Sequence, residues 1–119
     1  MVWDPARVTP KPWGSVLGFF HGLAERNDDF RPMVQLVKYV SSQTYAASIS
    51  AATSGTALLV AREAEADWAL DALRVDVGLS GSIRFTLSRR CLVKPTTFEC
   101  EGKTIVQAFE RFLHNAKWI

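Results

Sequence analysis

Two stretches near the start of the chain carry apolar residues at helical spacing. Residues 13–27 form the first stretch, and Ser15 is its expected N-cap. The second stretch follows Pro32, a residue suited to the first turn of a helix. Valines in this second stretch also permit a strand, but the period of about 3.6 residues favours a helix. The apolar positions are Val16, Leu17, Phe20 and Leu23 in the first stretch and Met33, Leu36, Val37 and Val40 in the second.

Alternation of apolar and polar residues predicts extended strands through the middle of the chain. Residues 44–62 are expected to form a β-hairpin that turns at Ser54-Gly55. Its first strand is rich in alanine and serine, which lets a helix of the same chain, or less often a ligand, approach the sheet closely. The expected cross-strand pairs are Ile49 with Val60 and Ala51 with Leu58.

A second hairpin, residues 82–101, contains both cysteines and follows a strand expected at residues 73–77. Lys94 to Thr97 is the expected turn, because Pro95 has the backbone conformation that its second position requires. Paired residues share a face of the sheet, so this register gathers both thiols and two large apolar side chains into one cluster. The expected neighbours are Val93 with Phe98, Leu92 with Glu99, Cys91 with Cys100, and Val75 with Ile83 or Phe85.

Arg89 breaks the alternation of this hairpin. It has the same parity as Ile83, Phe85 and Leu87, so a regular strand would point its guanidinium into the core. Burying an unpaired charge is costly, which favours a β-bulge near Arg89-Arg90 or a place for Arg89 at the rim of the sheet. The alternative is that Arg89 points into a pocket and binds an anion.

Residues 104–118 carry the broadest apolar stripe and predict a third helix, with Thr104 as N-cap and Gln107 as its capping-box partner. The pattern therefore predicts an α+β fold over residues 13–119. It has two N-terminal helices, an antiparallel β-meander of about five strands and a C-terminal helix packed on the sheet. Residues 1–12 hold three prolines and are expected to form an extended arm. In the third helix the apolar side is Ile105, Val106, Phe109, Phe112, Leu113 and Ala116, and the polar side is Glu110, Arg111, Asn115 and Lys117.

Composition adds little to this fold and excludes several classes of function. The chain has 119 residues, of which 48% are hydrophobic and 22% charged, and its net charge is +2. So weak a charge gives no electrostatic argument for nucleic acid. No secretory signal and no apolar run of bilayer length is visible. We therefore expect a cytoplasmic protein without a membrane partner, in which both cysteines are free thiols.

The sequence lacks the phosphate-loop, dinucleotide-binding, nucleophile-elbow and zinc-protease motifs, and its cysteine spacing is no zinc signature. No cofactor and no metal are expected. A thiol catalyst is the best enzymatic hypothesis, because a thiolate needs only a nearby base or cation. Both cysteines are expected to face the core, where thiols are usually inert, so the hypothesis is disfavoured. Its residues are Cys91 or Cys100 as nucleophile, His114 or His21 as base, and Arg89 or Arg90 for the oxyanion.

A non-catalytic binding or adaptor domain, acting through protein–protein contacts or self-association, is the favoured function by elimination. Trp3 either anchors the arm on the domain or contacts a partner. The alternative is anion or nucleic-acid binding by a basic strip on the outward face of the sheet. Nucleic acid is the less favoured ligand, because no aromatic stacking platform accompanies the strip. The strip comprises Arg74, Arg84, Arg90 and Lys94, and the candidate binding residues are Arg84, Arg89, Arg90, Lys94, Trp3 and Trp13.

Overall fold

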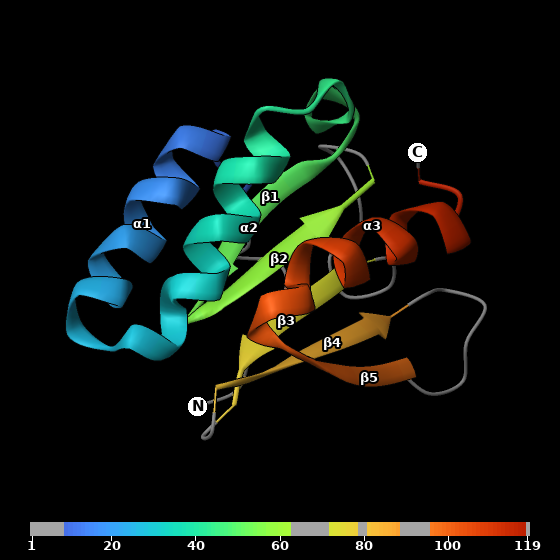
Figure 1. The fold of residues 1–119 in the computed structure, drawn as a ribbon. Coiled ribbons are helices and arrows are strands. Elements are labelled where there is room, and N and C mark those ends of the chain that lie inside the picture. The colour runs from blue at the N-terminus through green and yellow to red at the C-terminus, as the bar shows by residue number, and fades with distance from the viewer. Residues whose placement is uncertain (1–8, 63–71, 79–80, 89–95, 119) are drawn as a thin grey trace.

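A computed structural model describes residues 9–62, 72–78, 81–88 and 96–118, which form three α-helices and a five-stranded antiparallel sheet (Figure 1). The strands are adjacent in chain order, β1-β2-β3-β4-β5, as in a meander. The predicted α+β fold is confirmed. The helices are α1 (Trp13–Arg26), α2 (Arg31–Ser41) and α3 (Ile105–Asn115). The strands are β1 (Ser50–Ser54), β2 (Ala57–Ala61), β3 (Ala72–Val77), β4 (Ser82–Ser88) and β5 (Thr96–Glu101).

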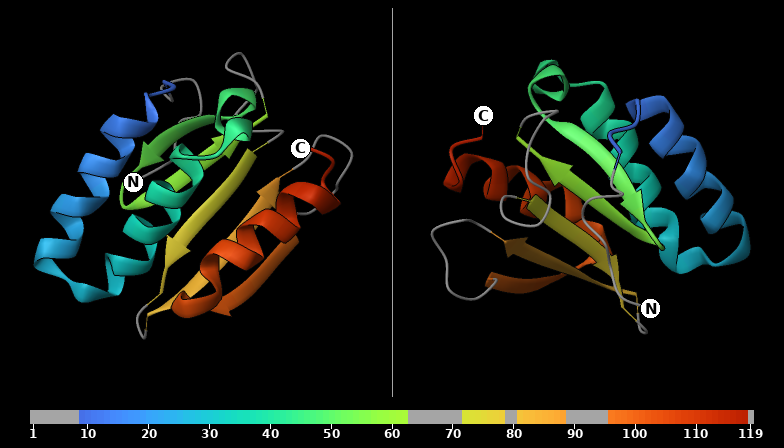
Figure 2. Two further views of the ribbon diagram at one scale, coloured as in Figure 1. Left: turned by 45° about the horizontal axis from the view of Figure 1, so that its top comes forward. Right: turned by 180° about the vertical axis from the view of Figure 1, so that it is seen from behind.

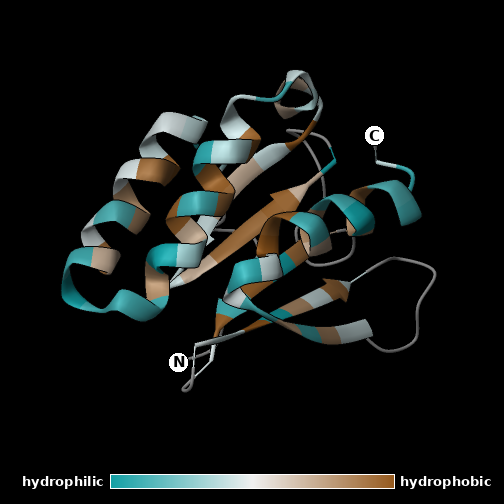
Figure 3. Ribbon diagram, in the orientation of Figure 1, coloured by the Kyte–Doolittle hydropathy of each residue, from teal (hydrophilic) through white to brown (hydrophobic). Residues whose placement is uncertain are grey.

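All three helices cover the same face of the sheet, as the two views in Figure 2 show. The main core lies between this face and the helices, and it includes Leu58 and Val60 of β2. The whole of β2 is buried, because Leu59 and Ala61 belong to a second, smaller cluster with Ala52 and Ala72. Figure 3 shows the apolar residues gathered on β2 and on the helix surfaces turned toward the sheet. Fully buried large side chains include Phe20 of α1, Met33 and Leu36 of α2, Leu58, Leu73, Ile83 and Phe85 of the sheet, and Phe109 and Leu113 of α3.

The helices occur where the apolar period predicted them, but Ser15 is not an N-cap and the predicted capping box at Thr104 does not form. α1 begins directly after Pro12, whose carbonyl accepts a hydrogen bond from the N–H of Ser15 at 3.0 Å, so Ser15 lies inside the helix. Thr104 does precede α3, but its hydroxyl donates to the carbonyl of Glu101 at 3.0 Å. Thr104 is the N-cap residue as predicted, but its side chain makes no capping hydrogen bond, so the expected capping box with Gln107 is absent. In both places the chain satisfies the helix start through backbone groups of the preceding turn.

The first part of the first predicted hairpin is a 3₁₀ turn. Residues Thr44–Ser48 form this turn, and the strand begins only at Ser50. Two contacts with distant elements hold it: the Trp13 indole donates to the carbonyl of Ala46 at 3.3 Å, and the Tyr45 hydroxyl donates to Glu110 at 2.9 Å. The small, strand-compatible residues here therefore follow their tertiary contacts and not their local alternation.

The remaining hairpin, β1–β2, turns one residue later than predicted. Gly55 has a φ of 59°, a left-handed value that glycine adopts without a steric penalty, so Gly55 and Thr56 form the turn. The register shifts by an even number of residues, so each side chain stays on its predicted face. The observed pairs are Ser50 with Ala61, Ala51 with Val60, Ala52 with Leu59, Thr53 with Leu58 and Ser54 with Ala57.

The strands of the second hairpin also pair in a different register from the predicted one. Phe98 pairs with Phe85, and their rings stack at 4.8 Å with an interplanar angle of 3°, whereas Val93 was the predicted partner. Thr96 and Thr97 belong to β5 and not to a turn, and Cys100 pairs with Ile83. The predicted pairing of Cys91 with Cys100 is therefore wrong for Cys100, while Cys91 lies outside the described residues. By contrast, Val75 lies opposite Phe85 as expected.

The two edges of the sheet differ. At the β1 edge, the N–H of Lys11 donates to the carbonyl of Ala51 at 2.8 Å, and the Lys11 ammonium donates to Thr53 at 3.0 Å. At the other edge, β5 pairs with β4, and no other described strand pairs with it. The β5 edge is therefore the one that this part of the chain leaves open.

Both tyrosines of the chain converge on one carboxylate of α3. The hydroxyls of Tyr45 and Tyr39 donate to Glu110 at 2.9 and 3.4 Å. Removal from water, together with the negative charge of Glu110 and the bonds to it, raises the pKa of both phenols above the usual value. These bonds connect α3 to α2 and to the Thr44–Ser48 turn.

We expect neither phenol to ionise near pH 10, the usual range for tyrosine. Because the folded chain holds these protons more tightly than the unfolded chain, their stabilising contribution is complete below about pH 10 and is lost as the pH rises further. Phenolate absorbance measured against pH tests this, since the chain has only two tyrosines. Glu110→Gln should lower both midpoints, and an unchanged titration in this variant would contradict the assignment.

Candidate binding groove between the edge strand and the last helix

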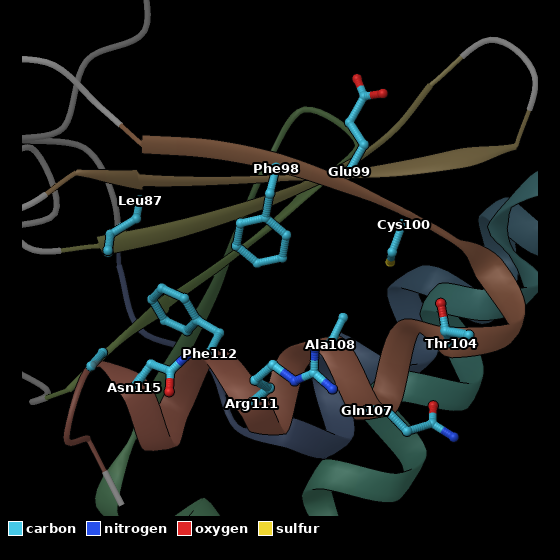
Figure 4. A pocket seen from close by; sticks show the side chains of 11 residues that line it. Leu87, Phe98, Glu99, Cys100, Thr104, Gln107, Ala108, Arg111, Phe112 and Asn115 are labelled. Atoms are coloured by element: carbon cyan, nitrogen blue, oxygen red, sulfur yellow. The ribbon is translucent and has the colours of Figure 1, made fainter.

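A groove of about 590 Å³ lies between β5 and α3 (Figure 4). It is formed by inward side chains of β4 and β5 on one side and by one full stripe of α3 on the other. Phe98 and Phe112 lie against each other in its apolar floor, with ring centroids 6.5 Å apart. Its lining comprises Leu87, Phe98, Glu99, Cys100, Thr104, Gln107, Ala108, Arg111, Phe112, Asn115 and Ala116.

The groove exists because α3 has two inward stripes of different size. Ile105, Phe109 and Leu113 are buried in the core and hold the helix on the sheet. The neighbouring stripe faces the edge strand and places Ala108 and Ala116 where larger side chains would fill the space. The buried stripe thus holds α3 on the sheet, and the neighbouring stripe of smaller residues leaves space between α3 and β5.

One positive charge lines the groove. Arg111 is exposed on α3, and no carboxylate of the described residues lies within ion-pair distance of its guanidinium. Glu99 borders the groove, but its carboxylate points to the opposite face of the sheet, where it accepts from Arg84 at 2.9 Å. The amides of Gln107 and Asn115 flank Arg111 on the same stripe. The arrangement offers an apolar floor, hydrogen-bonding amides and one cation.

Cys100 points into the groove from β5. Partial burial raises the pKa of its thiol above the usual value, and a hydrogen bond with Thr104 offsets part of that effect. A raised pKa keeps the thiol protonated at neutral pH, whereas a nucleophilic cysteine needs a lowered one. His114 lies on α3 but does not line the groove, and His21 borders a separate hollow between α1 and α2. Cys91 lies outside the described residues.

The predicted basic strip is largely neutralised in the part of the chain that the structure describes. Arg84 and Arg74 do project from the outward face, but each is paired: Arg84 with Glu99 at 2.9 Å and Arg74 with Asp76 at 2.9 Å. The other predicted members, Arg90 and Lys94, lie outside the described residues, as does Arg89.

The pair of Arg84 and Glu99 should contribute little to stability. Both side chains are more than half exposed, so solvent screens their attraction, and exposed pairs typically contribute about 0.2–1 kcal/mol. A double-mutant cycle of Arg84→Ala and Glu99→Ala, followed by urea unfolding, measures this coupling. A coupling well above this range would show that the outward face carries more electrostatic energy than its exposure implies.

Of the two tryptophans predicted to bind a partner, the structure describes only Trp13. Trp13 is half-buried, packs against the core and donates its indole N–H to Ala46, so it joins α1 to the Thr44–Ser48 turn. This contact gives Trp13 a structural role that sequence reasoning did not assign. Trp3 lies outside the described residues.

Sequence reasoning missed the groove. It assigned Arg111 and Asn115 to a solvated side of the last helix and placed Phe98 and Cys100 under that helix in a closed core. The only sequence signal for the groove was the pair of small residues Ala108 and Ala116 along the helix. These residues indicate a groove only when the strand that lies opposite them is known, and the predicted register placed the strands incorrectly.

No protein-family model matches the chain, and no curated protein or solved structure matches it either. Within residues 9–62, 72–78, 81–88 and 96–118, no three histidine, cysteine or acidic side chains come together as a metal site. Among the helices so described, none has the length and apolar character needed to span a bilayer.

Proposed function

We propose that this protein is a non-catalytic binding domain and that the groove between β5 and α3 is its binding site. The observation that carries the proposal is the groove itself: its volume of about 590 Å³ falls within the range of known ligand sites. Like such sites, it combines an apolar floor with a few polar groups that can orient a ligand. Its opening beside an edge strand suits contact with another protein chain.

The alternative functions receive less support from the same residues. A thiol nucleophile at Cys100 would need a lowered pKa, and burial acts in the opposite direction. Anion or nucleic-acid binding by the outward face would have to compete with Asp76 and Glu99, which already neutralise Arg74 and Arg84. Both considerations favour the groove as the functional surface.

An apolar fluorescent dye, anilinonaphthalene sulfonate, tests the proposal. Its sulfonate matches Arg111 and its rings match the floor of Phe98 and Phe112. We expect saturable binding to the folded wild-type protein, measured by direct excitation of the dye. Ala108→Trp should weaken binding by about tenfold or more, because the indole fills the groove.

Ala47→Trp is the matched control. It adds the same side chain at an exposed position that does not line the groove, and it should leave dye binding unchanged. Circular dichroism and urea unfolding establish that each variant is folded before binding is compared. Equal dye affinity in wild type and Ala108→Trp would refute the groove as the binding site.

A further inference from the structure

We infer that the groove receives an extended, acidic peptide segment of a partner protein, which adds a strand to β5. This inference rests on the proposed binding role of the groove and names its ligand. Four features of the described residues support it: an open edge, a matching length, an apolar floor and one available cation.

The open edge is the first feature. β5 is hydrogen-bonded to β4 on one side, and no other described strand pairs with it on the other. The backbone N–H and C=O groups along such an edge are free to pair with an added chain, which is how several peptide-binding domains obtain affinity. The groove opens at this edge, so a peptide paired with β5 would place alternate side chains against α3.

The length of the groove fits a peptide better than a compact small molecule. Its α3 lining runs from Thr104 to Ala116, which corresponds to about 18 Å of helix at 1.5 Å per residue. An extended chain covers that distance with about five or six residues. β5 itself is six residues long, so the strand and the groove accommodate the same segment.

The apolar floor and the positive charge of the groove indicate which peptide side chains it would accept. Phe98, Phe112 and Leu87 form an apolar surface that suits a large aliphatic or aromatic side chain. Arg111 has no described carboxylate partner, while Glu99, the acid that borders the groove, is bound to Arg84 on the opposite face. Charge complementarity therefore favours an aspartate or glutamate near the apolar residue, because guanidinium and carboxylate form bidentate hydrogen bonds.

A displayed library of random hexapeptides tests the inference with the full-length protein. We expect selected peptides to share one acidic position and one large apolar position. Arg111→Glu should weaken a selected peptide by about tenfold or more, whereas Lys38→Glu, the same charge reversal on the exposed face of α2, should not. Selection of peptides without an acidic position, or equal effects of the two reversals, would overturn the acidic specificity.

Backbone pairing is tested separately by methylating single backbone nitrogens of a selected peptide. Strand addition uses the N–H groups of alternate residues, so methylation should weaken binding at one parity and leave the other largely unaffected. Equal tolerance at every position would overturn strand addition.

Three further outcomes bear on this inference and on the proposed function. Saturable dye binding that Ala108→Trp abolishes, combined with no enriched peptide, overturns the peptide inference and leaves the groove as a small-molecule site. Absence of both dye and peptide binding overturns the two proposals together. A concentration-dependent dimer in sedimentation equilibrium that Ala108→Trp dissociates would also overturn the inference, because the occupant would then be a second copy of this chain.

Discussion

Replacing Phe85 by alanine should lower the free energy of unfolding by about 3–5 kcal/mol, the usual cost of removing a fully buried phenylalanine. Phe85 is 0% exposed, lies opposite Val75 in β3 and stacks on Phe98 of β5. Truncation removes the burial of the ring and leaves a cavity between the sheet and the helices. Urea unfolding followed by circular dichroism measures the change.

Phe19→Ala is the matched control for this large effect. Phe19 is 36% exposed on α1, and alanine is the better helix former, so we expect a loss below about 1 kcal/mol. Similar losses in the two variants would mean that the buried ring of Phe85 contributes no more to stability than the partly exposed ring of Phe19.

Gly102→Ala should lower the free energy of unfolding by about 1–3 kcal/mol, as overpacking usually does. A β-carbon at Gly102 would lie 2.6 Å from Cγ and 3.2 Å from Cβ of Pro32. The proline ring is rigid and sits in the first turn of α2, so relief requires a backbone shift. The contact matters because Gly102 opens the short turn that leads into α3.

A second substitution identifies the cause of that loss. Pro32→Ala removes Cγ, the atom that the new methyl group would meet at 2.6 Å, and leaves only Cβ at 3.2 Å, so the double variant should recover most of the stability lost in Gly102→Ala. Urea unfolding of both single variants and of the double variant gives the coupling. Simple additivity would show that the loss in Gly102→Ala does not come from the contact with Pro32.

The hydrophobic pattern predicted the three helices and the five-stranded meander and the faces that they bury, although it extended the first strand over Thr44–Ser48, which form a 3₁₀ turn. Met33, Leu36, Val37 and Val40 are all fully buried, as their spacing predicted. The reason is that burial of an amphipathic stripe depends on its period, which a single sequence contains.

Strand registers could not be predicted in the same way. The true partner of Phe98 is Phe85, and the predicted one was Val93, a difference of an even number of residues. An even shift keeps every side chain on the same face, so alternation cannot distinguish the two registers. The choice depends on specific contacts, here the stacking of two phenylalanine rings.

The candidate site could not be predicted from the sequence, for a related reason. A groove is the space that two elements leave between them, and no residue type marks it. Arg111 has the sequence context of any solvated helix residue, and only the placement of α3 beside β5 puts it in the same groove as Phe98. Arg84, by contrast, was a reasonable candidate by type, and its pairing with Glu99 depends on the same register that alternation could not fix.

The unequal edges of the sheet should also limit how far this protein can polymerise. Growth into a fibre through strand addition requires that every copy offer a receptive edge on both sides. At β1 the carbonyl of Ala51 is already taken by Lys11, and the ammonium of that lysine sits beside Thr53. A charged lysine at an edge opposes the approach of another strand. Strand addition at β5 should therefore yield complexes of fixed stoichiometry, even where the protein is highly concentrated.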